Sequence, residues 1–558
     1  MIIPRPAPNG WGRTTRWHHI LIGDPLLIPT LLSRREALAR LAAVAASASF
    51  RPGEWRPIFA DPLDGTIADY RAGLMHGEWT VVEMTSRALE RCSTSGTRFH
   101  AIDALSPTAL ADARAADDRR RRGHLGGPLD GVPVFAKAIY DMKGLPTTGS
   151  NAEWARLFPE TIPHDSLEVE RLRSAGAIVL GKTAADDFAY HGNGTSSHTG
   201  QVLNPHDPTG TRTPGGSSAG SAVAVSGGMA FAALGTDDGG SNRIPAQFTG
   251  VVGMKPTFGL VPRTGVIPTW PYLDTHGPLA RSVADAALLL AAVAGADKSD
   301  PLVRGEKLDR RPFVALRDDA LAGVRLGIVD AHVPRSQMSA EALAMWDRAV
   351  GDLRAAGAAV DSFVAAITTV NYRPAFSAAA RQRGDVPPNS RSPAPTANAL
   401  YRYFARRTRD PRDAMRRGYD AYRFYYDVLP ASFDACVPLL AQPMAHDPAG
   451  QSFARSRGQV VATLAASMHA AGVVAMVYPT MPFNATRIVD QWPDIRVALG
   501  FGNWLGLPEV SVPAGIGADG MPALNLSVVG LPGDDARVLA LAHAYERQSR
   551  RFAGTSGQ

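Results

Sequence analysis

The chain is organised around residues 215–245, which read GGSSAGSAVAVSGGMAFAALGTDDGGSNRIP. Ser217 and Ser241 each follow a pair of glycines. Glycine permits backbone conformations closed to other residues and lets a substrate approach main-chain N–H groups. A serine beside such donors can attack a carbonyl carbon while the donors stabilise the oxyanion. The small, apolar residues between the two serines favour a buried helix over 218–225 and a strand over 229–234, although two flexible loops would also fit.

A lysine lies upstream in the apolar segment GVPVFAKAI, residues 131–139. Its alternating pattern predicts a strand, and places Lys137 on the same face as Pro133 and Phe135. Burial disfavours the ammonium form and lowers the pKa of a lysine, which makes Lys137 a possible general base. The alternative is a lysine at a strand end whose ammonium group reaches solvent.

Taken together, these elements resemble the amidase signature family. The matching segments are GPLDGVPVFAK (127–137), GGSSAGS (215–221), GTDDGGSNRIP (235–245), GVVGMKPT (250–257), DTHGPLA (274–280) and GLPEVSVPA (506–514). The two serines are 24 residues apart (241 − 217), which fits the family. The resemblance covers roughly residues 62–550. It implies an α/β fold in a single large domain, residues 63–550, whose mixed, twisted β-sheet core is sandwiched by α-helices.

The resemblance also implies a Ser-cisSer-Lys triad. Ser241 would be the nucleophile, and Ser217, behind a cis peptide bond, would relay the proton. Lys137 would be the base, and later the acid that protonates the leaving amine. An acyl-enzyme would form on Ser241 and be hydrolysed by water, with no metal or organic cofactor.

Other residues would support these three. The oxyanion hole would be formed by the backbone N–H groups of Asp238, Gly239, Gly240 and Ser241. Ser218 would satisfy nearby backbone groups, and Asp237 and Arg243 would pin the nucleophile loop rather than act on the substrate. This sequence departs from the family at three positions. Many members have aspartate where this chain has Ala138. The usual residue is threonine or isoleucine at Asp238, and isoleucine at Asn242. A carboxylate at 238 would oppose an oxyanion unless paired or turned away, so we expect it to face the substrate pocket and favour a polar or cationic group.

Several other functions are compatible with these motifs. Residues 216–220 also fit G-x-S-x-G, the nucleophile elbow of α/β-hydrolases, with Ser218 as the nucleophile. That elbow requires a preceding strand, which Pro208 and Pro214 disfavour, and His276, His469 and His543 lie in no distinctive setting. The same triad could act on esters, carbamates or anilides. An amidotransferase subunit that delivers ammonia to charged tRNA and an inactive amidase-like binding protein are further alternatives; Arg243-Ile-Pro, in place of Arg-Gln-Pro, disfavours the first.

Composition sets broad limits on partners. The chain has 558 residues, of which 45% are hydrophobic and 20% charged, an ordinary globular balance. Cys92 and Cys436 give no metal or disulfide pattern. The formal charge is +6, but residues 1–48 hold six arginines and two acidic residues, which leaves +2 (6 − 4) for the rest. We therefore expect a small-molecule or peptide-like amide substrate, no nucleic-acid partner, no membrane span, and a monomer or homodimer.

Residues 1–48 predict an export signal with an N-terminal extension. Residues 33–38, SRREAL, resemble a twin-arginine signal. An alanine-rich apolar stretch follows at 41–48 and ends in a small-residue cleavage pattern. The expected location is periplasmic or secreted, and cytoplasmic if the stretch is only an alanine-rich helix. Residues 49–62 read as a linker and 551–558 as a tail.

The remaining pattern alternates between helices and strands, as α/β folds do. Helices are expected over 66–125, 167–175 and 339–356, and strands over 177–180, 324–329 and 359–363. Residues 368–450 read as a variable insertion over the mouth of the site. Its aromatic residues could line an acyl or aryl pocket, although helical spacing favours the core; they are Tyr401, Tyr403, Phe404, Tyr422, Phe424, Tyr425 and Tyr426.

Overall fold

A computed structural model describes residues 61–303, 308–442, 446–490 and 496–550 of the chain. Residues 57–558 form one compact unit. The expected export signal at 1–48, almost all of the linker at 49–62 and the tail at 551–558 lie outside the described residues. None of the helices in the described ranges is long and apolar enough to cross a membrane.

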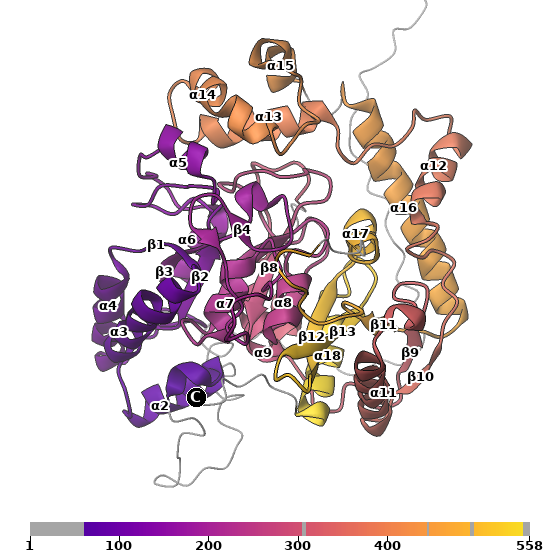
Figure 1. Ribbon diagram of the computed structural model, residues 1–558, viewed down its shortest axis with the longest axis horizontal. Helices are drawn as coiled ribbons and strands as arrows, with labels where there is room; N and C mark the ends of the chain where they lie inside the picture. The colour runs from indigo at the N-terminus through magenta and orange to yellow at the C-terminus, as the bar shows by residue number, and fades with distance from the viewer. Residues whose placement is uncertain (1–60, 304–307, 443–445, 491–495, 551–558) are drawn as a thin grey trace, which may run out of the picture. The chain divides into compact units, whose positions relative to one another are not determined.

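Within the described residues, one mixed sheet of eleven strands forms the centre of the unit (Figure 1). In spatial order the strands are β1 (Ile102–Leu105), β3 (Ile178–Thr183), β2 (Pro133–Lys137), β6 (Ala232–Asp237), β8 (Thr275–Ala280), β7 (Val252–Lys255), β12 (Glu509–Ile516), β13 (Pro522–Val529), β11 (Ala475–Pro479), β9 (Arg325–Ile328) and β10 (Ala359–Ser362). A separate short hairpin pairs β4 (Thr195–Ser196) with β5 (Gly200–Gln201).

The order of the parallel strands brings the lysine and the second serine loop to one edge of the sheet. β2 runs parallel to both β3 and β6, with Val134 opposite Ala232. Lys137 is the last residue of β2, and Asp237 is the last residue of β6. Because the carboxyl ends of adjacent parallel strands meet at the same edge, both residues lie there.

Helices cover both faces of the sheet. The chain passes from β2 to β3 through α6 and from β3 to β6 through α7, moving in opposite directions across the sheet. Right-handed crossovers therefore place α6 and α7 on opposite faces. α7 packs against α8, and α6 packs against α9, which contacts α18. The bounds of the helices in this part are α2 (Ile67–His76), α3 (Val81–Arg91), α4 (Ala109–Arg121), α5 (Ala152–Leu157), α6 (Leu167–Ser174), α7 (Ala219–Ser226), α8 (Arg243–Thr249), α9 (Val283–Val293), α10 (Arg311–Val314), α11 (Ala340–Ala355), α17 (Arg496–Leu505) and α18 (Asp535–Ser549). The expected α/β fold, with a sheet between helices, is confirmed.

α7 is the buried small-residue helix that the sequence predicts. Every residue from Ala219 to Ser226 is buried. A Cβ on Gly220 would collide with the backbone of Ala184 and Ala101. Only small side chains allow the helix to approach the strands this closely, and Ser218, immediately before α7, is thereby fixed against the sheet.

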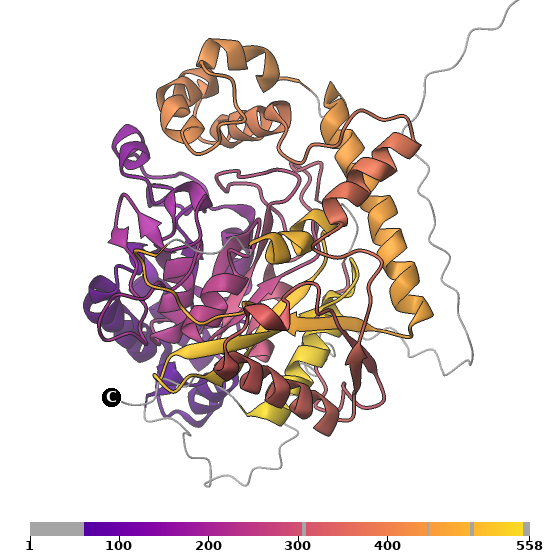
Figure 2. The same ribbon diagram turned by 45° about the vertical axis from the view of Figure 1, so that its right-hand side comes forward.

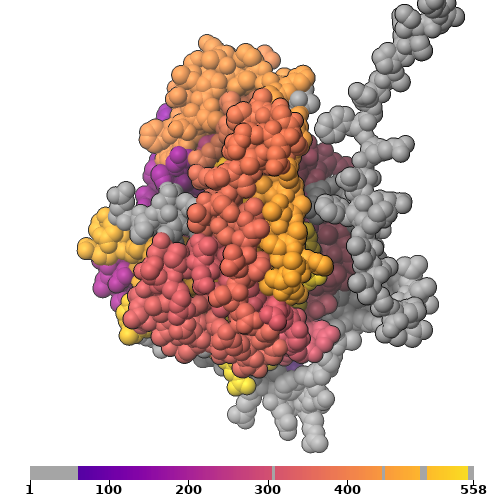
Figure 3. Space-filling view, turned by 90° about the vertical axis from the view of Figure 1, so that its right-hand side faces the viewer, coloured from indigo at the N-terminus to yellow at the C-terminus, as the bar shows by residue number. Residues whose placement is uncertain are grey.

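The expected insertion forms a group of helices of its own. They are α12 (Tyr372–Gln382), α13 (Pro393–Ala405), α14 (Pro411–Arg423), α15 (Phe433–Leu440) and α16 (Pro448–Ala470). α13 packs against α14 and α15, and Figure 2 shows these three together. α12 packs along α16, and the pair forms much of the face in Figure 3. Hydrogen bonds from Tyr403 to Asp141, Tyr422 to Pro268 and Tyr426 to Phe188 join the insertion to loops at the carboxyl edge of the sheet.

Two expectations about local structure need comment. The helical pattern over 66–125 is interrupted by β1, an edge strand paired antiparallel with β3. Of the seven aromatic residues of the insertion, Tyr403, Phe404, Tyr422 and Tyr426 are buried, whereas Phe424 is 78% exposed. The buried four belong to the main hydrophobic core, as helical spacing suggests. Cys92 and Cys436 are also buried, as free thiols.

Candidate active site

Lys137 and Ser217 form a buried pair at the carboxyl edge of the sheet. Both side chains are fully buried. Lys137 Nζ donates hydrogen bonds to Ser217 Oγ at 2.8 Å and to Thr236 Oγ1 at 2.9 Å. The peptide bond between Gly216 and Ser217 is cis, as the resemblance implies. Residues 80 positions apart in the sequence are thus brought into direct contact.

Asp186 holds the backbone around Ser217. Its N–H donates to the Ser217 carbonyl oxygen at 3.3 Å. Its carboxylate accepts from the N–H groups of Gly194 at 3.1 Å and Thr195 at 3.0 Å. A Cβ at Gly216 would collide with this carboxylate, which explains why the residue before Ser217 is glycine.

The buried setting makes Lys137 a competent base near neutral pH. Burial removes water from the ammonium form and lowers the pKa of Lys137 from 10.5 to about 8. The carboxylates of Asp238, Asp186 and Asp274 oppose this shift, in that order. A substantial fraction of Lys137 is therefore neutral at mildly alkaline pH and has a lone pair that can accept a proton.

This shift predicts the acidic limb of the pH–rate profile. We expect kcat/KM for an uncharged amide to rise with pH through a single ionisation near pH 8, because only the neutral amine accepts a proton. Measuring kcat/KM between about pH 6 and 10 tests this. The arginine in Lys137→Arg stays protonated throughout, so this variant should be inactive over the whole pH range. If its kcat/KM still rose with pH at the same midpoint as in wild type, the ionisation would belong to another group.

Ser218 is tied into the scaffold and links the two serine loops. Its Oγ donates to Asn242 Oδ1 at 2.9 Å, lies 3.2 Å from the Thr236 carbonyl oxygen, and accepts from the Thr236 N–H at 3.2 Å. Its N–H donates to the Ser241 carbonyl oxygen at 3.1 Å. Asn242 Nδ2 donates in turn to Met254 O at 3.0 Å. Asn242 is thus a bridge between the loops and β7.

The geometry does not support Ser218 as a nucleophile at an elbow. Ser218 is fully buried, and its hydroxyl is engaged by protein atoms. Residues 203–214, all of them described, contain no strand of the main sheet, only an isolated bridge at Arg212. The elbow requires a strand directly before the serine.

Asp237 and Arg243 brace the second serine loop. Arg243 Nε and Nη2 donate to the two carboxylate oxygens of Asp237 at 2.9 and 2.8 Å, and Nη1 donates to Glu509 Oε2 at 2.6 Å. All three side chains are fully buried. Although burial acts to raise it, the Arg243 charge holds the pKa of Asp237 well below its usual range. Asn503 also contacts both, since its Oδ1 accepts from Arg243 at 2.9 Å and its Nδ2 donates to Asp237.

One expected oxyanion donor is occupied in the structure. The Gly240 N–H donates to Asp237 Oδ1 at 2.7 Å, so it is not available to a substrate oxygen. Gly240 has φ +115, which suits glycine at this sharp turn. In the described part of the chain, the N–H groups of Asp238, Gly239 and Ser241 donate to no protein acceptor. These three remain the candidate donors.

Ser241 differs from the other two serines in its exposure. Its residue is partly exposed, and Asp238 and Gly239 beside it are partly exposed as well. Ser217 and Ser218 are fully buried. Among the three serines, Ser241 is therefore the one that is not fully buried.

The sequence analysis missed a buried histidine beside the nucleophile strand. His276 lies on β8 opposite Thr236. Its Nδ1 faces Glu168 Oε2 at 2.8 Å, and its Nε2 faces Asp274 Oδ1 at 3.3 Å. Burial disfavours its charge, but the two carboxylates outweigh burial and raise the pKa of His276 to about 10. The histidine is therefore a cation at neutral pH. The signal for it in the sequence was the two-residue spacing between His276 and Asp274, which lies directly before β8.

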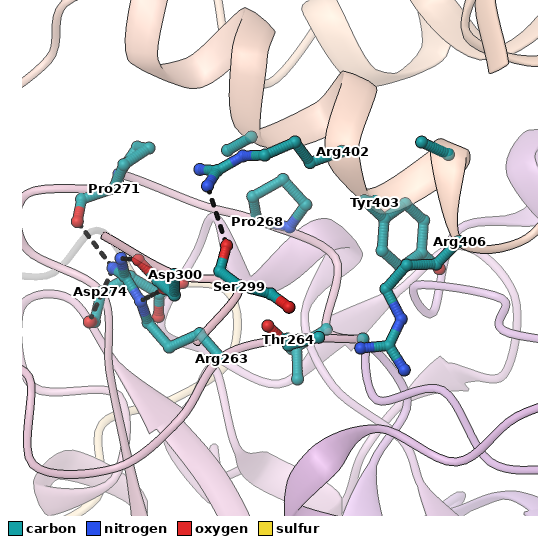
Figure 4. Close-up of a pocket in the computed structure, with 14 residues that line it drawn as sticks. Arg263, Thr264, Pro268, Pro271, Asp274, Ser299, Asp300, Arg402, Tyr403 and Arg406 are labelled. Atoms are coloured by element: carbon teal, nitrogen blue, oxygen red, sulfur yellow. Dashed lines mark hydrogen bonds and ion pairs between the residues drawn. The ribbon is translucent and has the colours of Figure 1, made fainter. Parts of the chain in front are cut away.

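A cavity of about 260 Å³ lies against the loop 256–274 that connects β7 and β8. Its walls come from residues 263–274 and 299–300 and from α13 and the residue after it (Figure 4). Arg263 is held there by Asp300 at 2.7 and 3.0 Å. The cavity therefore lies between the insertion and the loop, not at the serine-bearing loops.

These features define a class of site. Lys137 and Ser217 form a fully buried pair, and a cis peptide bond precedes Ser217. The next residue, Ser218, is hydrogen-bonded to the second, glycine-rich loop, which carries the partly exposed Ser241. That arrangement can transfer an acyl group to a serine and deliver the serine proton to a lysine. Acyl transfer to a serine is thus the chemistry that this arrangement can support.

Comparisons with known proteins agree with this class. The model of the Amidase family matches residues 83–427. The peptide amidase of Stenotrophomonas maltophilia is similar in structure, with a TM-score of 0.70 and 30% identity, over 87% of this chain and 97% of that one. A glutamyl-tRNA(Gln) amidotransferase subunit from Cereibacter sphaeroides is 33% identical over 505 residues, 86% of this chain and 96% of its own length. The chain belongs to the amidase family, whose members here cleave or transfer amide C–N bonds.

Proposed function

We propose that this protein hydrolyses a carboxylic amide through an acyl-enzyme and releases a carboxylate and either ammonia or an amine. The observation that carries this proposal is the 2.8 Å hydrogen bond between Lys137 and Ser217. A buried amine in contact with a serine hydroxyl can accept a proton from it and return it, and this pair adjoins the loop that carries the partly exposed Ser241. Ser241 is the group whose proton it would take, through Ser217.

In the proposed reaction, every proton transfer takes place among Ser241, Ser217, Lys137, the substrate and water. Ser241 Oγ attacks the carbonyl carbon as its proton passes to Ser217 Oγ and the Ser217 proton passes to Lys137 Nζ. The tetrahedral oxyanion is held by the N–H groups of the loop before Ser241. When the C–N bond breaks, the Lys137 proton returns through Ser217 to the leaving nitrogen. Water then attacks the ester on Ser241 by the same route.

A second candidate is an amidotransferase subunit. The Cereibacter relative, matched over nearly its whole length, favours it. In that case glutamine would be the amide, and ammonia would pass to a charged tRNA in an assembly with other subunits. The proposed triad would serve this function without change, so the distinction lies in the substrate and in partners. Esters, carbamates and anilides would use the same triad if the pocket accepts them.

The purified full chain tests these alternatives directly. We expect ammonia release from C-terminally amidated dipeptides by the protein alone, and labelling of Ser241 by a fluorophosphonate probe. Amide and matched ester substrates, assayed together, show which is preferred. Glutamine hydrolysis that appears only with co-purified subunits and glutamyl-tRNA would establish the second candidate. Folded protein that neither labels at Ser241 nor releases ammonia would contradict both.

A further inference from the structure

Asp238 lies three residues before Ser241 and next to the Gly239–Gly240 turn. The residue is half-buried. Its Oδ1 is buried and has no hydrogen-bond partner among the described residues, and none of the ion pairs in that part of the chain involves it. A buried carboxyl oxygen without a partner is costly. In the described part of the chain, the fold therefore keeps an acidic group beside the nucleophile loop with no cation in an ion pair with it.

The residues facing Asp238 do not supply the missing partner. Asp274 is already balanced by His276. Arg263, the nearest arginine in the loop, is committed to Asp300 and to the carbonyl oxygens of Pro271 and Asp274 (Figure 4). Lys137 must be neutral to act as a base. Among the described residues, no cation is thus committed to Asp238.

A second polar group lies beside it, unpartnered as well. Thr269 is fully buried, and its Oγ1 makes no hydrogen bond of good geometry among the described residues. Its hydroxyl faces the carboxyl groups of both Asp238 and Asp274 and favours the charged form of each. The Thr269 hydroxyl therefore lies within reach of the Asp238 carboxyl group, and a donor that meets Asp238 can also meet the Thr269 oxygen.

Two tyrosines of the insertion, Tyr422 and Tyr426, interact electrostatically with this acidic group. Tyr422 and Tyr426 stack with ring centroids 4.5 Å apart, and Trp270 meets Tyr426 at 4.9 Å. Burial, and after it the carboxylates of Asp238 and Asp274, raise the pKa of the Tyr422 hydroxyl, so this ring lies within electrostatic range of both acids. Aromatic rings together with a carboxylate are a favourable environment for an organic ammonium ion.

We propose that Asp238, with Thr269 and the Tyr422–Tyr426 pair, forms a subsite for a primary ammonium group of the substrate, beside the nucleophile. The inference rests on the proposed amide hydrolysis and specifies its substrate class: an amide that carries an ammonium group a few bonds from the scissile carbonyl. Asp238 is then a specificity-determining residue, and the acidic departure from the family has a use.

The proposal also implies a dependence on pH. Burial, and after it the neighbouring Asp274, raise the pKa of the Asp238 carboxyl well above its usual value. A higher pH favours the carboxylate form, so the preference for cationic over neutral substrates should grow as pH rises. The ionisable or polar groups facing Asp238 are Lys137 from β2, Asp237 from β6, Asp274 before β8, Arg263 and Thr269 from the loop, and Tyr422 and Tyr426 from the insertion.

The test compares paired substrates on the full-length protein. Alkanamides that end in an ammonium group, with two to five methylenes, are assayed against isosteres that end in a methyl group. For at least one length we expect wild type to favour the ammonium amide about tenfold or more in kcat/KM, and Asp238→Asn to reduce this ratio to about one to threefold. The ratio is the readout because damage to the oxyanion donors lowers both rates alike. Glu160→Gln, which removes an exposed charge elsewhere, should leave the ratio unchanged.

Two outcomes would overturn the proposal: a ratio near one at every chain length, or a wild-type ratio that survives in Asp238→Asn. If neither amide is hydrolysed, that result counts against the proposed function. The subsite is then tested by a binding measurement. n-Butylammonium should raise the melting temperature of wild type more than that of Asp238→Asn, while n-butanol should affect both equally. Equal shifts with n-butylammonium would contradict the subsite.

Discussion

Replacing Ser241 by alanine should lower kcat for amide hydrolysis by at least about 10⁴-fold, because no other group of the site can form the acyl-enzyme. Ser217 and Ser218 are fully buried, whereas Ser241 is partly exposed in the loop that also carries the free N–H donors. Residual activity would reflect binding and the oxyanion donors alone. The measurement is single-turnover and steady-state kinetics on protein whose far-UV and near-UV spectra match wild type.

Ser218→Ala is the matched control for this prediction. It removes a hydroxyl of the same size in the neighbouring loop, and leaves Asn242 Oδ1 and the Thr236 N–H without a partner. We expect a loss of about 1–3 kcal/mol in stability and only a modest loss of kcat. The reverse pattern, with Ser218→Ala inactive and Ser241→Ala active, would establish the nucleophile-elbow mechanism.

The part of the site that could be predicted from sequence is the part made by local chemistry. A glycine pair precedes both Ser217 and Ser241. Such pairs mark places where the backbone turns sharply or where a carboxylate packs against the backbone, as the Asp186 carboxylate packs against Gly216. The apolar run around Lys137 signalled burial, and burial alone determines the direction of its pKa shift. These inferences need no knowledge of distant contacts.

The parts that were missed depend on long-range pairing. β1 reads as helix because its four residues become a strand only through an edge position beside β3. The charge of His276 depends on Glu168, 108 residues earlier in the sequence, so His276 alone looked ordinary. Gly240 was expected to face the substrate, but Asp237 accepts its N–H, which is visible only once the turn is closed. Side-chain partners across the fold cannot be derived from spacing.

Arg243→Met should destabilise the fold by about 3–5 kcal/mol. The substitution keeps an unbranched chain in the core but leaves Asp237 and Glu509 as buried carboxylates without their cation. Chemical denaturation at neutral pH measures the loss. Arg325→Met, which breaks an exposed ion pair with Asp361 at 2.7 Å, is the matched control and should cost at most about 1 kcal/mol.

The pH dependence of that loss identifies its cause. In wild type the pKa of Asp237 lies below its unfolded value, so the pair stabilises the fold at neutral pH, and this contribution is lost only as the solution becomes strongly acidic. Without Arg243, burial raises the pKa of Asp237 above the unfolded value, so the penalty is present at neutral pH and is relieved as pH falls. The difference between variant and wild type should therefore shrink from about pH 8 to pH 5. Lys255, whose pKa burial and then Arg243 lower to about 7, offsets part of the loss by taking up a proton. A variant of near wild-type stability that had lost its activity would instead assign Arg243 a direct role toward the substrate.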